Sequence, residues 1–513
     1  MQEQYIIGTD IGTSGCKSIL IDSTGKVIAS AMEEYPLYTP KPGWAEQNPD
    51  DWWKATAKTI RIIMEKSGVN PQAVKGIGLS GQMHGLVALD KGHQVVRPAY
   101  LWNDQRSHKQ CQDIYKAVGG KKELLKYTNN SMLPGYTGGK ILWLKQEEPQ
   151  HYKQSVIFLN PKDYIRFRLT GEFATEVSDA SGTGLFDVKN RKWSQELLEI
   201  LDIPLELLPQ AYESPEITGH LTGEASEQTG LPKSVPVAGG GGDAVIQTTG
   251  TGLIIEGILG ITLGTAGVTS MGLNNYTFNH TGNFQVFCSN APNKWNIMGV
   301  TLAAGGSFQW FKNKLCRFEN KIAQETDQDV YKIIDEAVEK ESEPGSKGLV
   351  FLPYLIGERC PYPDPNASGV FIGVTLRHNH EDFARSVMEG VTFSQKQIYE
   401  LMTEMDTNLK AKEIRVSGGG SSSKLWRQML ADIFQLPVKT VSGSKEGGAY
   451  GAALVAGTGC GIWDTVEQAT EVIKTETELL PDKSNKKIYE GLFEVYKSLY
   501  PTLKPTFDKL AEI

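Results

Sequence analysis

The sequence has neither long apolar runs nor closely spaced cysteines. No window of the 513 residues approaches the ~18 apolar residues of a membrane helix, and residues 1–10 lack the basic and apolar segments of a secretion signal. The six cysteines show no CxxC or Cys/His ligand spacing, which argues against a zinc motif and a disulfide scaffold. We therefore expect a cytoplasmic protein with free thiols and no membrane partner.

Motifs of several common enzyme classes are also missing. The segment that ends in Lys17-Ser18 lacks both glycines of a Walker A loop. Residues 78–82 lack the second glycine of a nucleophile elbow, and no HExxH motif occurs. P-loop enzymes, serine hydrolases and zinc proteases are therefore not indicated. Residues 239–244 can be fitted to a dinucleotide-binding fingerprint, so a dehydrogenase stays an alternative.

Charge and composition are those of an ordinary globular protein. Apolar residues make up 40% and charged residues 22% of the chain. The net charge is -8, and acidic and basic residues are interspersed, so no basic face is available for a nucleic acid. Strand-like apolar runs alternate with amphipathic helical stretches, which indicates an α/β protein, and the length predicts about three domains or two large ones.

A glycine-rich octapeptide occurs twice. Residues 8–15 (GTDIGTSG) recur as residues 260–267 (GITLGTAG), each between strand-like runs, which predicts two similar domains unless the likeness is due to chance. Glycine lets the backbone approach a ligand closely, so that consecutive N–H groups can converge on an anion. Two such turns could bind one polyphosphate, although a single turn of this kind would normally be a plain hairpin.

Two further glycine loops lie between a strand and a helix. Residues 239–243 follow a strand-like run and precede a helix-like one, and residues 417–422 do the same. This order places the N-terminus of a helix where it can bind a phosphate or a nucleotide. Each loop alone is a weak indication, and all four glycine turns together favour a nucleotide site.

Several separate segments resemble the FGGY family of carbohydrate kinases. They are residues 7–14, 41–53, 80–85, 101–106, 353–359 and 369–374. The resemblance implies an α/β, two-domain fold like that of actin and hexokinase (ribonuclease H-like), with a ligand cleft between domains at residues 1–250 and 251–513. Residues 80–85 and 101–106 are most similar to the xylulokinases of this family.

The reaction that the resemblance implies is transfer of the γ-phosphate of ATP, with Mg²⁺, to a hydroxyl of a ketopentose. D-xylulose is the first candidate, and another FGGY kinase acting on ribulose, gluconate or another polyol is the nearest alternative. Gly138-Gly139 and residues 244–247 depart from the xylulokinase pattern and leave the sugar open. An actin-like ATPase switch is the alternative of another class, and a homodimer is one option for the assembly.

Two aspartates are the candidates for the chemistry. Asp243 ends a glycine run, and from the sequence alone it could be a general base or the N-cap of the next helix; the resemblance implies the base. Asp10 corresponds to Thr262 in the repeated octapeptide. A carboxylate on one turn only suits a Mg²⁺ ion held mostly through water, and a turn-capping role is the alternative.

The remaining candidates fall into two groups. Those for the sugar offer a flat apolar surface with donors and acceptors, as polyol recognition requires: Met83, His84, Trp102, Asn103 and Asp104. Asp104 could instead cap a helix, and a lone histidine such as His84 is often structural. Those for the nucleotide are Gly12, Thr13, Gly264, Thr265, Gly418, Gly419 and Ser422.

Overall fold

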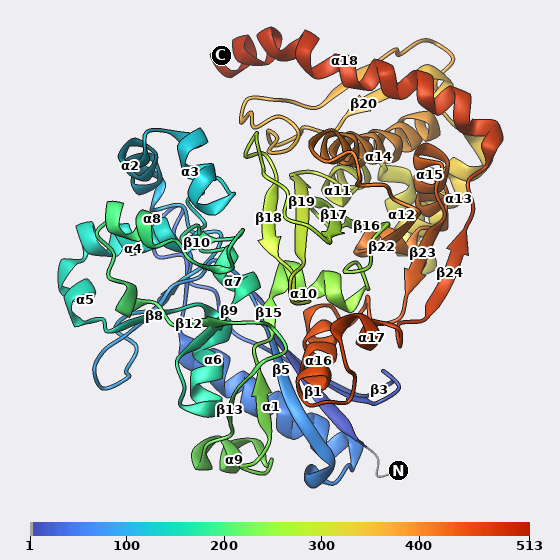
Figure 1. Ribbon diagram of the computed structural model, residues 1–513. Coiled ribbons are helices and arrows are strands. Elements are labelled where there is room, and N and C mark those ends of the chain that lie inside the picture. The colour runs from blue at the N-terminus through green and yellow to red at the C-terminus, as the bar shows by residue number, and fades with distance from the viewer. Residues whose placement is uncertain (1–3) are drawn as a thin grey trace. The chain divides into compact units, whose positions relative to one another are not determined.

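The computed structural model describes residues 4–513, which fold into two compact units (Figure 1). Within the described residues, unit 1 comprises residues 4–255, Gly272–Asn296 and Gly443–Lys474. Unit 2 comprises Glu256–Met271, Ile297–Ser442 and Thr475–Ile513. Each unit is an α/β structure built on a mixed sheet, which confirms the fold class expected from the sequence. The domain boundary at residue 250 stays a prediction.

The sheet of unit 1 has the strand order β13-β14-β5-β1-β2-β3. Its central strand β1 (Tyr5–Ile11) pairs antiparallel with β2 (Gly15–Asp22) and parallel with β5 (Val74–Gly81). Successive side chains of a strand point to opposite faces. Accordingly, Ile7 packs in the core with residues of α1 (Pro49–Ser67), whereas Ile6 packs with residues of α16 (Gly448–Gly459).

Helix α16 approaches the sheet so closely that only glycine fits beneath it. A Cβ atom on Gly8 would lie 1.9 Å from the carbonyl oxygen of Ala449, and one on Gly78 would lie 1.9 Å from that of Ala452. Both distances are far below van der Waals contact, so these two glycines are required for the packing of α16 on β1 and β5. Helix α16 is itself composed mainly of glycine and alanine, which leaves room for this approach.

Unit 2 repeats this arrangement. Strand β16 (Ile258–Leu263) pairs antiparallel with β17 (Gly267–Leu273) and parallel with β22 (Glu413–Ser417), as β1 does with β2 and β5. The registers also correspond, because Asp10 faces Ser80 across β1 and β5, and Thr262 faces Ser417 across β16 and β22. The duplicated octapeptide is therefore part of a duplicated fold.

The other elements complete the two units. In unit 1 the helices are α2 (His108–Val118), α3 (Lys121–Thr128), α4 (Thr137–Glu147), α5 (Pro149–Gln154), α6 (Pro161–Thr170), α7 (Val177–Ser181), α8 (Gln195–Ile200), α9 (Gly223–Thr229), α10 (Asp243–Gly250) and α17 (Val466–Thr470). In unit 2 they are α11 (Gly305–Leu315), α12 (Arg317–Thr326), α13 (Val330–Glu341), α14 (His380–Met405), α15 (Lys424–Phe434) and α18 (Lys486–Ala511).

The remaining strands are mostly short. They are β3 (Val27–Glu34), β4 (Glu46–Gln47), β6 (Val87–Leu89), β7 (Ala99–Tyr100), β8 (Ile157–Leu159), β9 (Ala174–Glu176), β10 (Phe186–Asp187), β11 (Lys192–Trp193), β12 (Gln210–Tyr212), β13 (Ile217–His220), β14 (Pro236–Ala238), β15 (Gly241–Gly242), β18 (Gln285–Cys288), β19 (Trp295–Thr301), β20 (Val350–Leu352), β21 (Val370–Ile372), β23 (Val438–Val441) and β24 (Thr475–Leu479). Short 3₁₀ helices occur at Pro71–Ala73, Leu205–Leu207, Ser346–Gly348, Gly419–Ser422 and Lys483–Asn485.

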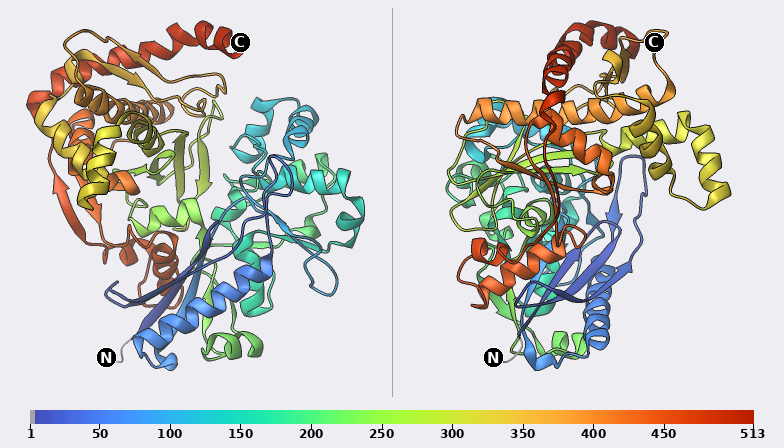
Figure 2. Two further views of the ribbon diagram at one scale, coloured as in Figure 1. Left: turned by 180° about the vertical axis from the view of Figure 1, so that it is seen from behind. Right: turned by 90° about the vertical axis from the view of Figure 1, so that its right-hand side faces the viewer.

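The C-terminal helix closes unit 2 on one side. Helix α18 packs against α14, α15 and β20 and runs along the outside of the unit (Figure 2). All six cysteines are free, as the sequence leads us to expect. Within residues 4–513, no helix is both long enough and apolar enough to cross a bilayer.

Candidate functional site

The first glycine turn joins β1 to β2 and contacts residues of the predicted sugar site. The N–H of Gly12 donates to the carbonyl oxygen of Gly15 at 3.0 Å. The hydroxyl of Thr13 accepts a hydrogen bond from the indole Nε1 of Trp102 at 2.9 Å and donates to Oε1 of Gln82 at 3.2 Å. The structure thus brings Thr13, predicted to bind nucleotide, together with Trp102, predicted to bind sugar.

Asp10 and Asp243 are brought together by the pairing of β15 with β5. Gly241 lies opposite Ser80, and the Ser80 hydroxyl donates to Oδ1 of Asp10 at 2.5 Å. Asp243 follows β15 directly as the first residue of α10, whose N-cap is Gly242. The N-cap role considered for Asp243 therefore belongs to Gly242, while the Asp243 carboxylate accepts from the N–H of Ala244 at 2.7 Å.

Both carboxylates titrate at unusually high pH. Burial raises the pKa of Asp10, against the opposing effects of the Ser80 hydrogen bond and the charge of Lys17. Burial, and then the negative charge of Asp10, raise the pKa of Asp243 to about 7. A carboxylate with this pKa can accept a proton at neutral pH, and a perturbed pair of acids in one place is typical of functional sites.

Met83 and His84 lie on the loop that follows β5. Met83 is 2% exposed and packs on Gly242, where a Cβ atom would lie 2.6 Å from Cγ of the methionine. His84 has a positive φ of 69°, and its ring stacks on Tyr136 with 4.3 Å between the ring centroids. Its Nδ1 donates to the carbonyl oxygen of Gly182 at 2.5 Å, so that Nε2 is the acceptor nitrogen of the neutral ring.

Lys140 supports this loop and was not predicted as a site residue. Its buried ammonium group donates to the carbonyl oxygen of His84 at 2.7 Å and to that of Gly135. Burial lowers the pKa of Lys140 to about 7. In the sequence only the preceding Gly138-Gly139 stands out, because the role of the lysine itself depends on the packing of α4 beneath the loop.

The second predicted sugar segment contains three residues with different exposure and different hydrogen-bond partners: Trp102, Asn103 and Asp104. The indole of Trp102 is 47% exposed. Oδ1 of Asn103 is buried and has no hydrogen-bond partner among residues 4–513. Asp104 is fully buried, and its carboxylate forms a 2.7 Å ion pair with Arg106 and accepts from the N–H of Ala45 at 2.7 Å. Asp104 thus holds the backbone of its loop, and its contact with a sugar stays a prediction.

Unit 2 contains a separate cavity of about 720 Å³. This volume lies within the range of small-molecule sites. Four of the predicted nucleotide residues line it: Gly264, Thr265, Gly419 and Ser422. Gly418 is not among the lining residues; it has a φ of 82°, and a Cβ atom there would lie 2.7 Å from the carbonyl carbon of Leu263. This glycine lets the chain pass close to β16, and its contact with a nucleotide stays a prediction.

The rest of the cavity wall was not predicted. Gly305, Phe308 and Gln309 come from α11, and Tyr331 and Asp335 from α13. Aromatic rings and carboxylates on the same wall suit a ligand with both flat apolar and polar parts. Burial raises the pKa of Asp335 to about 6.

A sequence signal for α11 did exist. Gly305-Gly306 follows a strand and opens a helix, like the glycine loops singled out above. The N–H of Gly305 donates to the carbonyl oxygen of Gly264 at 2.7 Å, and that of Gly306 to the carbonyl oxygen of Thr265 at 3.1 Å. This glycine pair therefore holds the second turn against α11. Helix α13 carries no such signal.

The chain is similar to known proteins over nearly its whole length. Residues 5–250 match the N-terminal domain of the FGGY family of carbohydrate kinases, and residues 259–460 match its C-terminal domain. The chain is 37% identical to a xylulose kinase of Bacillus subtilis, with 98% of this chain and 97% of the relative covered. A gluconokinase of the same organism is 29% identical, with 99% and 98% covered. The crystal structure of a ligand-bound xylulose kinase from Lactobacillus acidophilus superposes with a TM-score of 0.89 at 28% identity, covering 99% of this chain and 100% of that one.

We expect Asp243→Asn to stabilise the protein at neutral pH. The pKa of Asp243 is raised from 3.8 to about 7, so between these values the folded protein keeps a proton that the unfolded chain has lost. The free energy of unfolding therefore falls as pH rises through this window. Asparagine removes the charge, so the melting temperature of the variant should exceed that of the wild type at pH 8, and the difference should shrink towards pH 4.

The control is Asp464→Asn, which removes an exposed carboxylate of the same unit. Melting temperatures measured by circular dichroism at pH 4, 6 and 8 would test the expectation. A gain that is equal at all three pH values, or no gain at pH 8, would contradict the raised pKa of Asp243.

Proposed function

Since the chain belongs to the FGGY family of carbohydrate kinases, we propose that it transfers the γ-phosphate of ATP to D-xylulose, forming D-xylulose 5-phosphate. The kinase class follows from the family, and the greater identity to xylulose kinase than to gluconokinase favours the ketopentose. The observation that carries the proposal is the Asp243 carboxylate, whose pKa is about 7, beside the loop of Met83 and His84.

Asp243 is the general base of the proposed reaction. It accepts the proton of the sugar hydroxyl while the hydroxyl oxygen attacks the γ-phosphorus, and the bond from that phosphorus to the bridging oxygen of ADP breaks. A base that titrates near the working pH is effective in such a transfer. The indole of Trp102 would cover an apolar face of the sugar, and His84 Nε2 would accept from one of its hydroxyl groups.

Asp10 would hold Mg²⁺. The donors present fit this ion, because Mg²⁺ prefers carboxylate oxygens and retains water. Burial raises the pKa of Asp10 and of Asp243, and the charge of Asp10 raises that of Asp243 further, so a cation beside them would stabilise the ionised carboxylates. When bound, Mg²⁺ neutralises charge on the phosphates.

The cavity of unit 2 is the proposed binding site of the adenosine part of ATP. Phe308 and Tyr331 supply aromatic surface there, and Gly419 and Ser422 lie on the loop before α15. The turns at Gly12-Thr13 and Gly264-Thr265 would bind phosphate oxygens through their N–H groups. A cytoplasmic location is part of the proposal, and the free cysteines support it, because thiols stay reduced in that compartment.

The proposal is tested by ADP release with MgATP and a panel of sugars. We expect the highest kcat/KM with D-xylulose, compared with L-ribulose, gluconate and glycerol. A preference for gluconate would contradict the substrate and retain the kinase. ATP turnover that is independent of every sugar would contradict the kinase and favour an ATPase switch.

Asp243→Ala should bind nucleotide normally and lose at least ~10²-fold in kcat, the range for removal of a general base. In the wild type, kcat/KM should rise with pH through about 7, as Asp243 ionises. In Asp10→Asn this rise of kcat/KM should occur at lower pH, even if the absolute rate is reduced. The reason is that the charge of Asp10 raises the pKa of Asp243 in the wild type. Unchanged turnover in Asp243→Ala would contradict its role as general base. A rise of kcat/KM at the same pH in Asp10→Asn would contradict the effect of Asp10 on the pKa of Asp243.

Gly419→Leu should raise the KM for ATP by roughly 10-fold or more, the scale for altered pocket contacts, and leave the KM for the sugar unchanged. Gly419 lines the cavity and a Cβ atom there meets no atom within 4 Å, so we expect the leucine to occupy part of the cavity with little disturbance of the fold. Ser421→Ala in the same loop is the control, because Ser421 is not among the residues that line the cavity. An unchanged KM for ATP would place the adenosine site elsewhere.

A further inference from the structure

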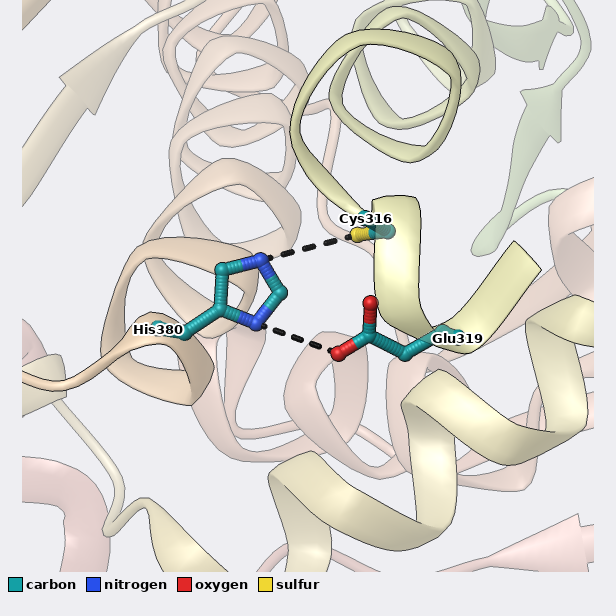
Figure 3. A group of neighbouring side chains, drawn as sticks. All are labelled: Cys316, Glu319 and His380. Carbon is teal, nitrogen blue, oxygen red and sulfur yellow. Dashed lines mark hydrogen bonds and ion pairs between the residues drawn. The ribbon is translucent and has the colours of Figure 1, made fainter. Parts of the chain in front are cut away.

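Three metal-ligating side chains meet between two helix N-termini of unit 2 (Figure 3). Cys316 immediately precedes α12, Glu319 lies in its first turn, and His380 is the first residue of α14. Sγ of Cys316 is 3.8 Å from Nε2 of His380, and Oε1 of Glu319 is 3.4 Å from Nδ1. One potential ligand atom from each residue lies within 4.8 Å of the others.

The geometry and the donor types suit zinc. A sulfur at about 2.3 Å and a nitrogen at about 2.0 Å from a tetrahedral ion are about 3.5 Å apart. The observed separation of 3.8 Å is close to this edge of a tetrahedron. Glu319 now contacts the other ring nitrogen, and its flexible side chain can turn to the same ion. Thiolate, imidazole and carboxylate together favour Zn²⁺ over Mg²⁺ or Ca²⁺, which prefer oxygen ligands alone.

An acidic side chain next to the cluster also favours a cation. A second carboxylate, that of Glu381, has Oε1 3.9 Å from Nδ1 of His380. Two acids therefore face the imidazole, and the charged groups in residues 4–513 that act on the Cys316 thiol are Glu319, Glu381 and Lys312. The side chain of His380 is 37% exposed, which gives an ion a path from solvent.

A different interpretation is a chain of hydrogen bonds from the thiol through His380 to Glu319, as in a cysteine nucleophile with its base. Cys316 is completely buried, so no substrate can reach its sulfur atom. His380 is also held flat against Phe311, with 5.3 Å between the ring centroids and an angle of 27° between the planes. These contacts suit a fixed ligand better than a mobile base.

We propose that Cys316, Glu319 and His380 bind one Zn²⁺ ion, with water as its fourth ligand. The thiol and the imidazole come from residues 64 apart in the chain, so the ion ties the start of α12 to the start of α14. Helix α12 packs on α11 and α13, the two helices that supply Phe308 and Asp335 to the cavity wall. The zinc site is thus a structural link behind this wall, and it does not depend on the identity of the sugar.

The test uses the full-length protein, stripped with EDTA and kept free of ATP and Mg²⁺. Competition with a chromophoric chelator should show one tightly bound Zn²⁺ per chain. Cys316→Ser and His380→Ala should each weaken this binding by at least about 100-fold, since loss of an outer-shell partner alone weakens metal binding 10- to 100-fold. Cys460→Ser, which changes a free cysteine of unit 1, is the matched control and should bind as the wild type does.

Two further measurements keep the test decisive if a variant misfolds. Co²⁺ bound to the wild type should show a thiolate charge-transfer band. Hydrogen exchange of the backbone amides in residues 317–326 should slow when Zn²⁺ is added to the wild type, and not in Glu319→Gln. Absence of the band, absence of tight zinc binding to the wild type, or unweakened binding in Cys316→Ser would each overturn the proposal.

Discussion

The parallel register of β1 with β5 is the constraint on which the rest of unit 1 depends. It sets Asp10 opposite Ser80, and the pairing of β15 with the same strand sets Gly241 beside Ser80 as well. Asp243 follows Gly241 by two residues, so the hydrogen bonds between these strands place Asp10 and Asp243 near each other. A shift of one residue would turn each of these side chains to the opposite face of the sheet. The glycines under α16 let this helix pack on the two strands, because any side chain at Gly8 or Gly78 would push the helix away.

The two units show how a duplicated fold acquires different chemistry. Ser80 bonds to Asp10 in unit 1, and Ser417 bonds to Thr262 at the matching position of unit 2, with 3.0 Å between the hydroxyl oxygens. The first pair contains a carboxylate and the second is neutral. The repeated strands and turns therefore have the same geometry, and the difference between Asp10 and Thr262 decides which of the two turns has a carboxylate beside it. This difference agrees with our assignment of the general base and the metal to unit 1 and of the adenosine site to unit 2.

The buried charged groups that the proposed chemistry requires lower the stability of the folded protein. Burial raises the pKa of Asp10, and it raises that of Asp243 to about 7, so holding both acids ionised at neutral pH opposes folding. Lys140, whose pKa burial lowers to about 7, adds to this cost while it supports the loop of His84. The well-packed sheet around this site offsets the unfavourable free energy of the buried charged groups. The burial that lowers the stability also raises the pKa of Asp243, and the proposed reactivity depends on that pKa.

The sequence by itself determined the α/β class, the duplicated turn and the family. It could do so because glycine turns and strand periodicity are local properties, set by backbone freedom and by the alternation of side chains. It also indicated Asp10 and Asp243, since both end recognisable strand and glycine segments. Only the tertiary structure decided the rest. Phe308 and Asp335 meet in a cavity, Asp104 accepts a hydrogen bond from the N–H of Ala45, and Cys316 meets His380, because segments that are separated in the chain pack together. Such contacts depend on packing between elements, which no short stretch of sequence encodes.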